Sequence, residues 1–202
     1  MLKQSVLSLF VCSFIAASLA AQDDAQVSLF FSPNGGCEKA IVNAINSAEK
    51  EILVTAYSFS SKPIAIALYN AATRGVPVYV ILDKGQVTAH YSMADDLAKS
   101  GLAVRIDRKE AIQHQKTIII DRKLLIAGSF NFTASAEHRN AETLLLIYSE
   151  AVAAKAVANW TEHFNHSQPH VAGQRWECSN GTCTLKPSQP SNPSKYRRTR
   201  RW

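Results

Sequence analysis

Polar side chains between residues 113 and 133 have types and spacing that could do chemistry together. His114 supplies an imidazole and Lys116 an ammonium, and Ser129 and Asn131 add a hydroxyl and a carboxamide. Imidazole is a nucleophile and a general acid near neutral pH, and the other three groups are donors that stabilise developing negative charge. The stretch has no carboxylate cluster for magnesium and no His/Cys set for zinc, so it implies neither metal nor cofactor. This set favours reaction at an anionic centre such as a phosphodiester.

Two apolar runs of strand length must position these groups. Residues 118–120 and 124–127 are aliphatic and are joined by polar residues 121–123, which predicts a hairpin of two buried strands. Side chains alternate along a strand with period two, so His114 and Lys116 project from the same side.

The segment that leaves the second run reads Gly-Ser-x-Asn. Ser129 and Asn131 share one side if the chain stays extended. Gly128 has no side chain and allows close approach of backbone or substrate. The hairpin therefore brings the four polar groups together, with Gly128 as part of the substrate-binding wall.

The order His-x-Lys, Asp and Gly-Ser-x-Asn resembles the signature of the phospholipase D superfamily, and the small single-motif endonuclease branch most closely. The segments that carry this resemblance are Phe31-Ser-Pro-Asn-Gly, Ala56-Tyr-Ser-Phe, Arg74-Gly-Val, Ile112-Gln-His-Gln-Lys and Gly128-Ser-Phe-Asn-Phe-Thr. It covers residues 27–165 and implies a metal-independent phosphodiesterase.

The resemblance also implies roles for individual residues. One histidine attacks phosphorus to form a phosphohistidine, and a second protonates the leaving oxygen. The chain has one His-x-Lys, so we expect a homodimer that places two copies of His114 face to face. Glu142 is expected to orient the imidazole. Asp121 counts among the signature residues, but its odd spacing from His114 predicts a structural role, bonding backbone or a basic neighbour.

Strand and helix patterns alternate through most of the chain. This alternation predicts an α/β fold: a mixed, partly parallel sheet flanked by helices on both faces. The expected strands are residues 27–31, 52–57, 76–82, 102–106 and 143–148, besides the hairpin, and the expected helices are 37–50, 64–74, 87–100 and 151–164.

The first twenty residues have the features of a secretory signal. Lys3 gives a positive start, residues 6–20 are apolar, and Ser18-Leu19-Ala20 offers a small-x-small cleavage site. We expect export to the periplasm or the medium and no integral membrane segment after cleavage, with an uncleaved anchor as the alternative. A catalytic domain would then span residues 21–166.

Residues 167–202 differ from this domain in composition. Cys178 and Cys183 flank Asn180-Gly181, a strong turn pair, and predict a disulfide-tied loop in an oxidising compartment. Cys37 is left over, either buried as a small apolar residue or bridging two subunits.

The formal net charge of +6 is concentrated at the C-terminus. Residues 166–202 carry +6 and Lys3 adds +1, which leaves residues 4–165 at −1. A flexible basic tail holds most of this charge, at Lys195, Arg197, Arg198, Arg200 and Arg201. Such a tail suits a nucleic-acid backbone, and an anionic membrane or plain solubilisation are the alternatives.

Three functions remain in view. An exported endonuclease acting on DNA, or on RNA, is favoured because the small body indicates an open cleft. A phospholipase D acting on phosphatidyl esters uses the same motif. A non-catalytic nucleic-acid-binding envelope protein is disfavoured, because a pure binder would not need His114.

Overall fold

The computed structural model describes residues 25–179 and 182–187, and from residue 174 onward only the backbone. The predicted signal at residues 1–20 and the basic tail from Lys195 lie outside this part of the chain. None of the helices in the described part is long and apolar enough to cross a membrane.

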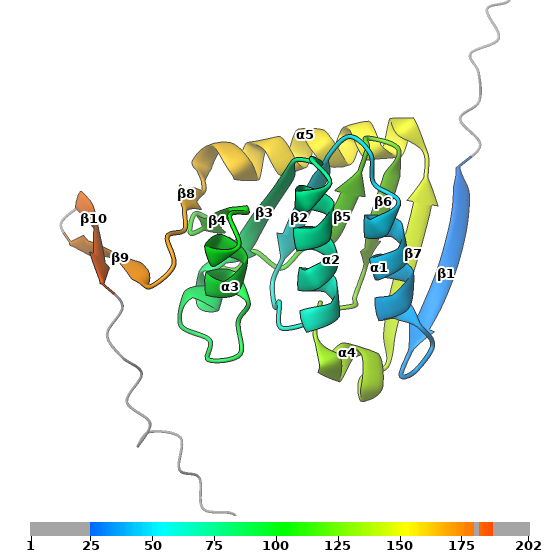
Figure 1. Cartoon of the computed structure of the whole chain (residues 1–202), viewed down its shortest axis with the longest axis horizontal. Helices are drawn as coiled ribbons and strands as arrows, with labels where there is room; N and C mark the ends of the chain where they lie inside the picture. The colour runs from blue at the N-terminus through cyan, green and yellow to red at the C-terminus, as the bar shows by residue number, and fades with distance from the viewer. Residues whose placement is uncertain (1–24, 180–181, 188–202) are drawn as a thin grey trace, which may run out of the picture.

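One eight-stranded mixed sheet organises the protein (Figure 1). Its order is β1-β7-β6-β5-β2-β3-β4-β8, with β2, β3 and β4 parallel and the other neighbours antiparallel. The strands are β1 Gln26–Ser32, β2 Ile52–Ala56, β3 Val78–Asp83, β4 Ala103–Asp107, β5 Lys116–Ile120, β6 Leu124–Gly128, β7 Glu142–Tyr148 and β8 Gln168–Pro169. This confirms the predicted partly parallel sheet.

Helices cover both faces of this sheet, as predicted. The helices α1 (Cys37–Asn46), α2 (Lys62–Thr73) and α3 (Ala94–Lys99) pack on one face over the larger apolar core. The long helix α5 (Glu150–His166) packs on the other, where Trp160 donates its indole N–H to the Val54 carbonyl at 3.1 Å. All five residues of β2 are buried, which explains why four of the five are apolar.

The helix predicted over residues 87–100 is wrong in its first half. The structure has a 3-10 turn, η1 (Lys84–Val87), then a loop, and only then α3. The Met93 N–H donates to the Phe59 carbonyl at 2.9 Å instead of to its own turn. The Ser92 hydroxyl then accepts the Ala94 N–H at 3.1 Å and helps start α3. A tertiary hydrogen bond therefore interrupts the helical periodicity.

The C-terminal part of the chain, from residue 167 to 187, contains more β-strand than predicted. β8 pairs with β4, so the sheet extends past residue 166. Two antiparallel strands, β9 (Gln174–Ser179) and β10 (Thr182–Pro187), flank the expected loop around Asn180-Gly181. Their register pairs Cys178 directly with Cys183. Their side chains lie outside those described, so the disulfide stays a prediction.

Cys37 begins α1 and is fully buried in the larger core. It is a free thiol, and its burial raises its pKa, with the carboxylates of Glu137 and Glu142 adding to the effect. Of the two alternatives, the structure has the buried apolar residue, because a bridge between subunits would require an exposed sulfur.

Candidate active site

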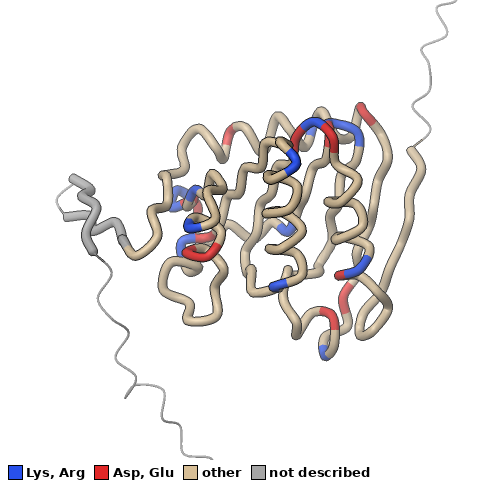
Figure 2. The backbone as a smooth tube through the Cα atoms, viewed as in Figure 1, with Lys and Arg blue, Asp and Glu red and all other residues tan. Residues whose placement is uncertain are grey.

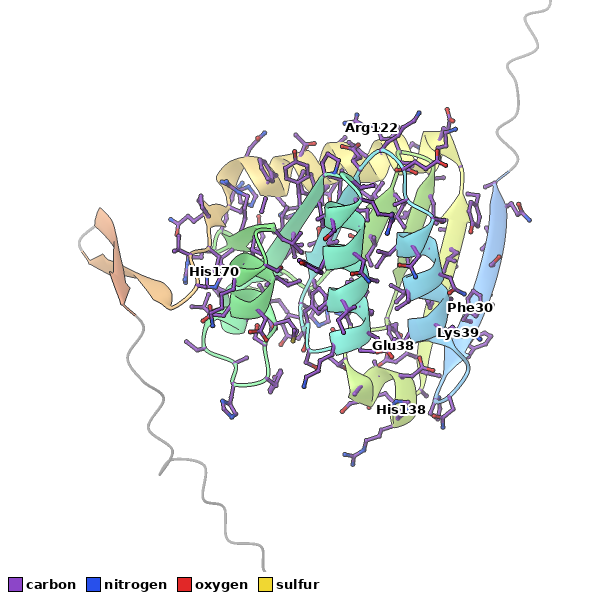
Figure 3. All side chains as sticks on the ribbon, viewed as in Figure 1. Phe30, Glu38, Lys39, Arg122, His138 and His170 are labelled. Atoms are coloured by element: carbon purple, nitrogen blue, oxygen red, sulfur yellow. The ribbon has the colours of Figure 1, made fainter. Side chains whose placement is uncertain are left out.

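The predicted polar groups converge because three adjacent strands are antiparallel. His114 and Lys116 lie at the start of β5, Ser129 follows the end of β6, and Glu142 begins β7. Antiparallel pairing puts the start of β5, the end of β6 and the start of β7 at one edge of the sheet. The helix α4 (Ala134–His138), which no sequence pattern predicted, lies at this edge, and Figure 3 shows His138 at the opposite end of the sheet from Arg122.

The side chains of Lys116 and His114 both lie against the aromatic ring of Tyr57. Lys116 is only 7% exposed, and its Nζ donates to the His114 carbonyl at 2.7 Å. The same Nζ lies 5.1 Å from the centre of the Tyr57 ring, and the Tyr57 and His114 ring centres are 4.4 Å apart. Tyr57, which lies in one of the segments that carry the resemblance, therefore belongs to the site.

Burial tunes the charge of this ammonium. Desolvation lowers the pKa of Lys116, while the nearby Glu142 carboxylate partly raises it again. A desolvated cation gains more from an arriving phosphate than an exposed one does. The imidazole of His114 is exposed and accessible to such a substrate.

Glu142 organises the hydroxyl of Ser129. Ser129 Oγ donates to Glu142 Oε2 at 2.6 Å and accepts the Thr143 N–H at 3.0 Å. The other carboxylate oxygen accepts from Asn140 Nδ2 at 3.0 Å. Among the described residues Glu142 makes no hydrogen bond to His114, so its predicted role as orienter of the imidazole in the same chain is not what the geometry shows.

Asn131 is held between two buried aromatic side chains. Phe130 and Phe132 are 1% and 0% exposed, and the Phe132 carbonyl accepts the N–H groups of Ser60 and Ser61, each at 2.9 Å. The carboxamide oxygen of Asn131 is buried without a hydrogen-bond partner among the described residues. An unpaired buried acceptor costs free energy, which a hydrogen-bond donor reaching this oxygen would recover.

Gly128 is required by the backbone rather than by a substrate. Its φ is +146°, and a Cβ added there would lie 2.1 Å from the Thr143 carbonyl oxygen. The close packing of β6 against β7 sets the position of Ser129, whose N–H donates to the same carbonyl at 3.0 Å.

Asp121 belongs to the signature but not to this cluster. It lies in the turn at the far end of β5, where it and Arg122 both have positive φ, 55° and 57°. Its carboxylate accepts the backbone N–H groups of Glu49, Lys50 and Glu51. Among the signature residues, the structure thus sets Asp121 apart from the group around His114 and gives it the bonds to backbone that its odd spacing predicted.

The segment formed by residues 113–115, which we call the strap, holds His114 in place through contacts that no sequence pattern predicted. Gln113 is 2% exposed, and its N–H donates to Asp83 Oδ2 at 2.8 Å. The Gln115 carbonyl accepts the Tyr57 N–H at 3.0 Å, and its side chain donates to Asn159 at 2.8 Å. The only signal in the sequence was two glutamines flanking a histidine next to an apolar run.

Comparison with known families agrees with this geometry. The family described as "Cardiolipin synthase, PLD-like domain" matches residues 41–167, which include all the site residues from His114 to Glu142. The chain belongs to the phospholipase D superfamily. Its members are phosphodiesterase hydrolases, so the predicted family, fold class and enzyme type are confirmed.

Curated relatives and solved structures carry this membership over most of the chain. A phospholipase D of Rickettsia conorii is 38% identical over 160 residues, covering 79% of this chain and 80% of the relative. The crystal structure of Nuc from Salmonella typhimurium, a phospholipase D family member, is 34% identical with a TM-score of 0.70, covering 73% of this chain and 99% of Nuc. NucT from Helicobacter pylori is 25% identical with a TM-score of 0.67, covering 73% of this chain and 100% of NucT.

Proposed function

We propose that this superfamily member is an exported, metal-independent endonuclease that cleaves DNA, or RNA, through a phosphohistidine intermediate. The observation that carries the proposal is an exposed His114 beside a buried Lys116 at a rim that also holds Ser129. The likeness to Nuc, of which 99% is covered, supports a body with no room for an inserted lipid-sheltering domain.

In the proposed reaction, a ring nitrogen of His114 attacks phosphorus, and the P–O bond to the leaving group breaks. A second imidazole donates a proton to the leaving oxygen. It then takes a proton from water, whose oxygen attacks phosphorus and releases His114. Lys116 and Asn131 donate hydrogen bonds to the non-bridging oxygens as charge builds on them, and Ser129 does so once its single hydroxyl proton turns from Glu142 to the substrate.

The second imidazole is proposed to come from another copy of the chain. A two-fold homodimer with both His-x-Lys segments at the axis would form one composite site. Each protomer would then supply an identical histidine, and one proton must be shared between them. A bell-shaped dependence of rate on pH is therefore expected.

The surroundings of the site support a polar substrate. Beside residues 57–61 lies a hollow of about 460 Å³, lined by Ser58, Ser60, Tyr91, Thr133, Ala134 and Ser135. Tyr91 is 64% exposed, so its ring is free to stack against a base. Hydroxyl groups suit sugar and phosphate better than acyl chains.

The distribution of charge along the chain supports a role for the C-terminal tail in the affinity for nucleic acid. Figure 2 shows Lys and Arg interspersed with Asp and Glu along the described backbone, and residues 4–165 sum to −1. Attraction to phosphates along a nucleic acid is proposed to come from residues 195–201. Deleting them should weaken DNA binding and its salt dependence while leaving the chemistry of a small phosphodiester unchanged.

A phospholipase D activity is the second candidate. The Rickettsia conorii relative bears that name and is matched over 80% of its length. In this alternative the tail docks on anionic headgroups.

The test uses supercoiled plasmid in excess EDTA. Wild type should nick it, His114→Ala should not, and His138→Ala, which removes an exposed histidine bonded to Asn34, should match wild type. No nicking by any of the three, either in excess EDTA or in buffer without chelator, would reject the nuclease. Release of headgroup from phosphatidylcholine vesicles by wild type would then establish the lipase.

Mixing experiments test the composite site. Wild type and His114→Ala are mixed, allowed to exchange subunits, and assayed at constant total protein. If both histidines are needed, activity at equal mixing falls to about a quarter, the fraction of wild-type homodimers. A fall to about half would mean that each chain works alone and would refute the composite site.

A further inference from the structure

A second polar cluster lies where α5 meets the end of β4. Among the described residues, Asp107, His163 and His166 are the group of potential ligands whose ligand atoms lie within 4.8 Å of one another. Asp107 ends β4, and the two histidines occupy the last turn of α5. The spacing of three residues puts both imidazoles on one helix face, with ring centres 5.2 Å apart. The proposed reaction uses none of the three.

One carboxylate oxygen in this cluster lies close to three different nitrogen atoms. Asp107 Oδ2 lies 2.8 Å from His163 Nδ1, 3.1 Å from Gln113 Nε2 and 3.1 Å from His166 Nε2. Three nitrogens compete for two lone pairs, and the contact with Asp107 leaves the buried His166 Nε2 without a well-formed hydrogen bond among the described residues. Gln113 Nε2 also lies 2.9 Å from His163 Nδ1. An amide nitrogen can only donate, so His163 Nδ1 would have to accept this bond and could not also donate to Asp107. Hydrogen bonds alone leave this arrangement incompletely satisfied.

A cation among these atoms would satisfy them. The Asp107 side chain is fully buried, and the side chains of His163 and His166 are 13% and 22% exposed. Burial raises the pKa of Asp107, but the two imidazoles, the Lys109 backbone N–H and the Gln113 side-chain amide outweigh this, so that the pKa lies below its usual value. The cluster thus offers one anionic oxygen and two imidazole nitrogens, the donor set that suits zinc with a fourth position left for water.

The observed spacing is close to what zinc requires. Zinc binds nitrogen and carboxylate oxygen at about 2.0–2.2 Å, so ligand atoms at neighbouring corners of a tetrahedron are separated by about 3.3 Å. The two distances to Asp107 Oδ2, 2.8 and 3.1 Å, need to open by only about 0.5 and 0.2 Å. Rotations of the histidine side chains supply such movements.

We propose that Asp107, His163 and His166 bind one zinc ion at a site separate from the reacting histidine. The ion fastens the last turn of α5 to the end of β4. Gln113 donates to Asp107 and precedes His114 in the chain, so it acts as an outer partner of the metal. Zinc therefore stabilises the strap that carries His114 without taking part in phosphodiester cleavage.

The test measures metal binding directly. Protein stripped with chelator and kept oxidised is titrated with zinc by calorimetry, and with cobalt while the visible absorption of a tetrahedral site is recorded. One equivalent should bind, and the melting temperature should rise. His163→Gln and His166→Gln should each weaken binding more than about 100-fold, because losses of outer partners alone cost 10–100-fold. The control variant His138→Gln, which replaces an exposed histidine outside the cluster, should bind zinc like wild type.

Each other outcome overturns the proposal. Wild type that binds no stoichiometric zinc refutes it without any variant, so poor folding of a mutant cannot hide the answer. Binding that survives in His163→Gln and His166→Gln places the ion elsewhere, and binding lost in His114→Gln places it in the reaction site. Activity is not the readout, so failure of the nuclease proposal would leave this result unaffected.

Discussion

Replacing Asp121 with Asn separates a structural role of this carboxylate from a chemical one. Oδ1 accepts the N–H of Lys50 at 2.7 Å and of Glu51 at 3.0 Å, and Oδ2 accepts that of Glu49 at 3.0 Å. Asn keeps one oxygen and replaces the other with an NH₂ group, so one amide loses its acceptor and the remaining bonds lose their charge. An unpaired donor costs about 1–3 kcal/mol, and these bonds are partly exposed to solvent, so we expect a loss of about 2 kcal/mol in unfolding free energy.

Asn isolates this effect, because it tolerates the left-handed backbone at φ 55°. Burial raises the pKa of Asp121, but the three backbone donors, aided by the charge of Lys50, outweigh it, and the net pKa lies below its usual value. A carboxyl with a lowered folded pKa stabilises fully above its unfolded pKa of about 3.9 and loses this stabilisation as pH falls through the folded pKa. The difference between wild type and variant should therefore be constant from pH 7 to 5 and shrink below about pH 4.

Urea denaturation of wild type and Asp121→Asn at several pH values measures this difference. Glu49→Gln is the matched control, because it removes one negative charge from an exposed neighbouring side chain and should change stability by less than about 0.5 kcal/mol. Turnover of a chromogenic phosphodiester, measured well below the melting temperature, should stay near wild type in both. Unchanged stability together with a large loss of turnover in Asp121→Asn would refute the structural assignment.

Three further substitutions test other parts of the site and fold. Gly128→Ala should cost about 3 kcal/mol or more in urea denaturation, because its Cβ would lie 2.1 Å from the Thr143 carbonyl oxygen at a φ of +146°. Ser61→Ala removes the hydroxyl that caps α2 and should cost about 1 kcal/mol by the same method, with turnover kept. Glu142→Gln removes the charge that raises the pKa of Lys116, so the pKa of this ammonium, followed by NMR titration of its side chain, should fall; an unchanged pKa would contradict this coupling.

The sequence predicted the fold well where short-range patterns decide it. The hairpin of β5 and β6 follows from two aliphatic runs and a polar turn, and α2 covers nearly all of the helix expected over residues 64–74. The helix expected from residue 87 fails because the Met93 N–H bonds to a carbonyl distant in sequence, at Phe59, which no local pattern reveals. The alternation in β9 and β10 around a turn pair was present, but its polar composition made it look like a loop.

The site was predictable to the extent that strand geometry dictates it. Alternation and antiparallel pairing place His114, Lys116 and Ser129 at one edge without knowledge of any distant contact. The partner of Glu142 depends on the register between β6 and β7, and the anchoring of Gln113 depends on strands β3 and β4. Such contacts are set by tertiary structure, so residue type and spacing could not assign them.

The exposed position of His114 bears on why the proposed reaction would draw on a second chain. A proton donor must lie across the phosphorus from the attacking imidazole, within hydrogen-bond reach of the leaving oxygen. Four other histidines already contact partners in the same chain: His138 contacts Asn34, His163 and His166 contact Asp107, and His170 contacts Asp95. Recruiting any of them would break these contacts, whereas a second copy of the rim brings an identical imidazole that is already exposed. A two-fold axis at this rim would also exclude water from Lys116 and Asn131 and so strengthen their interaction with the developing charge.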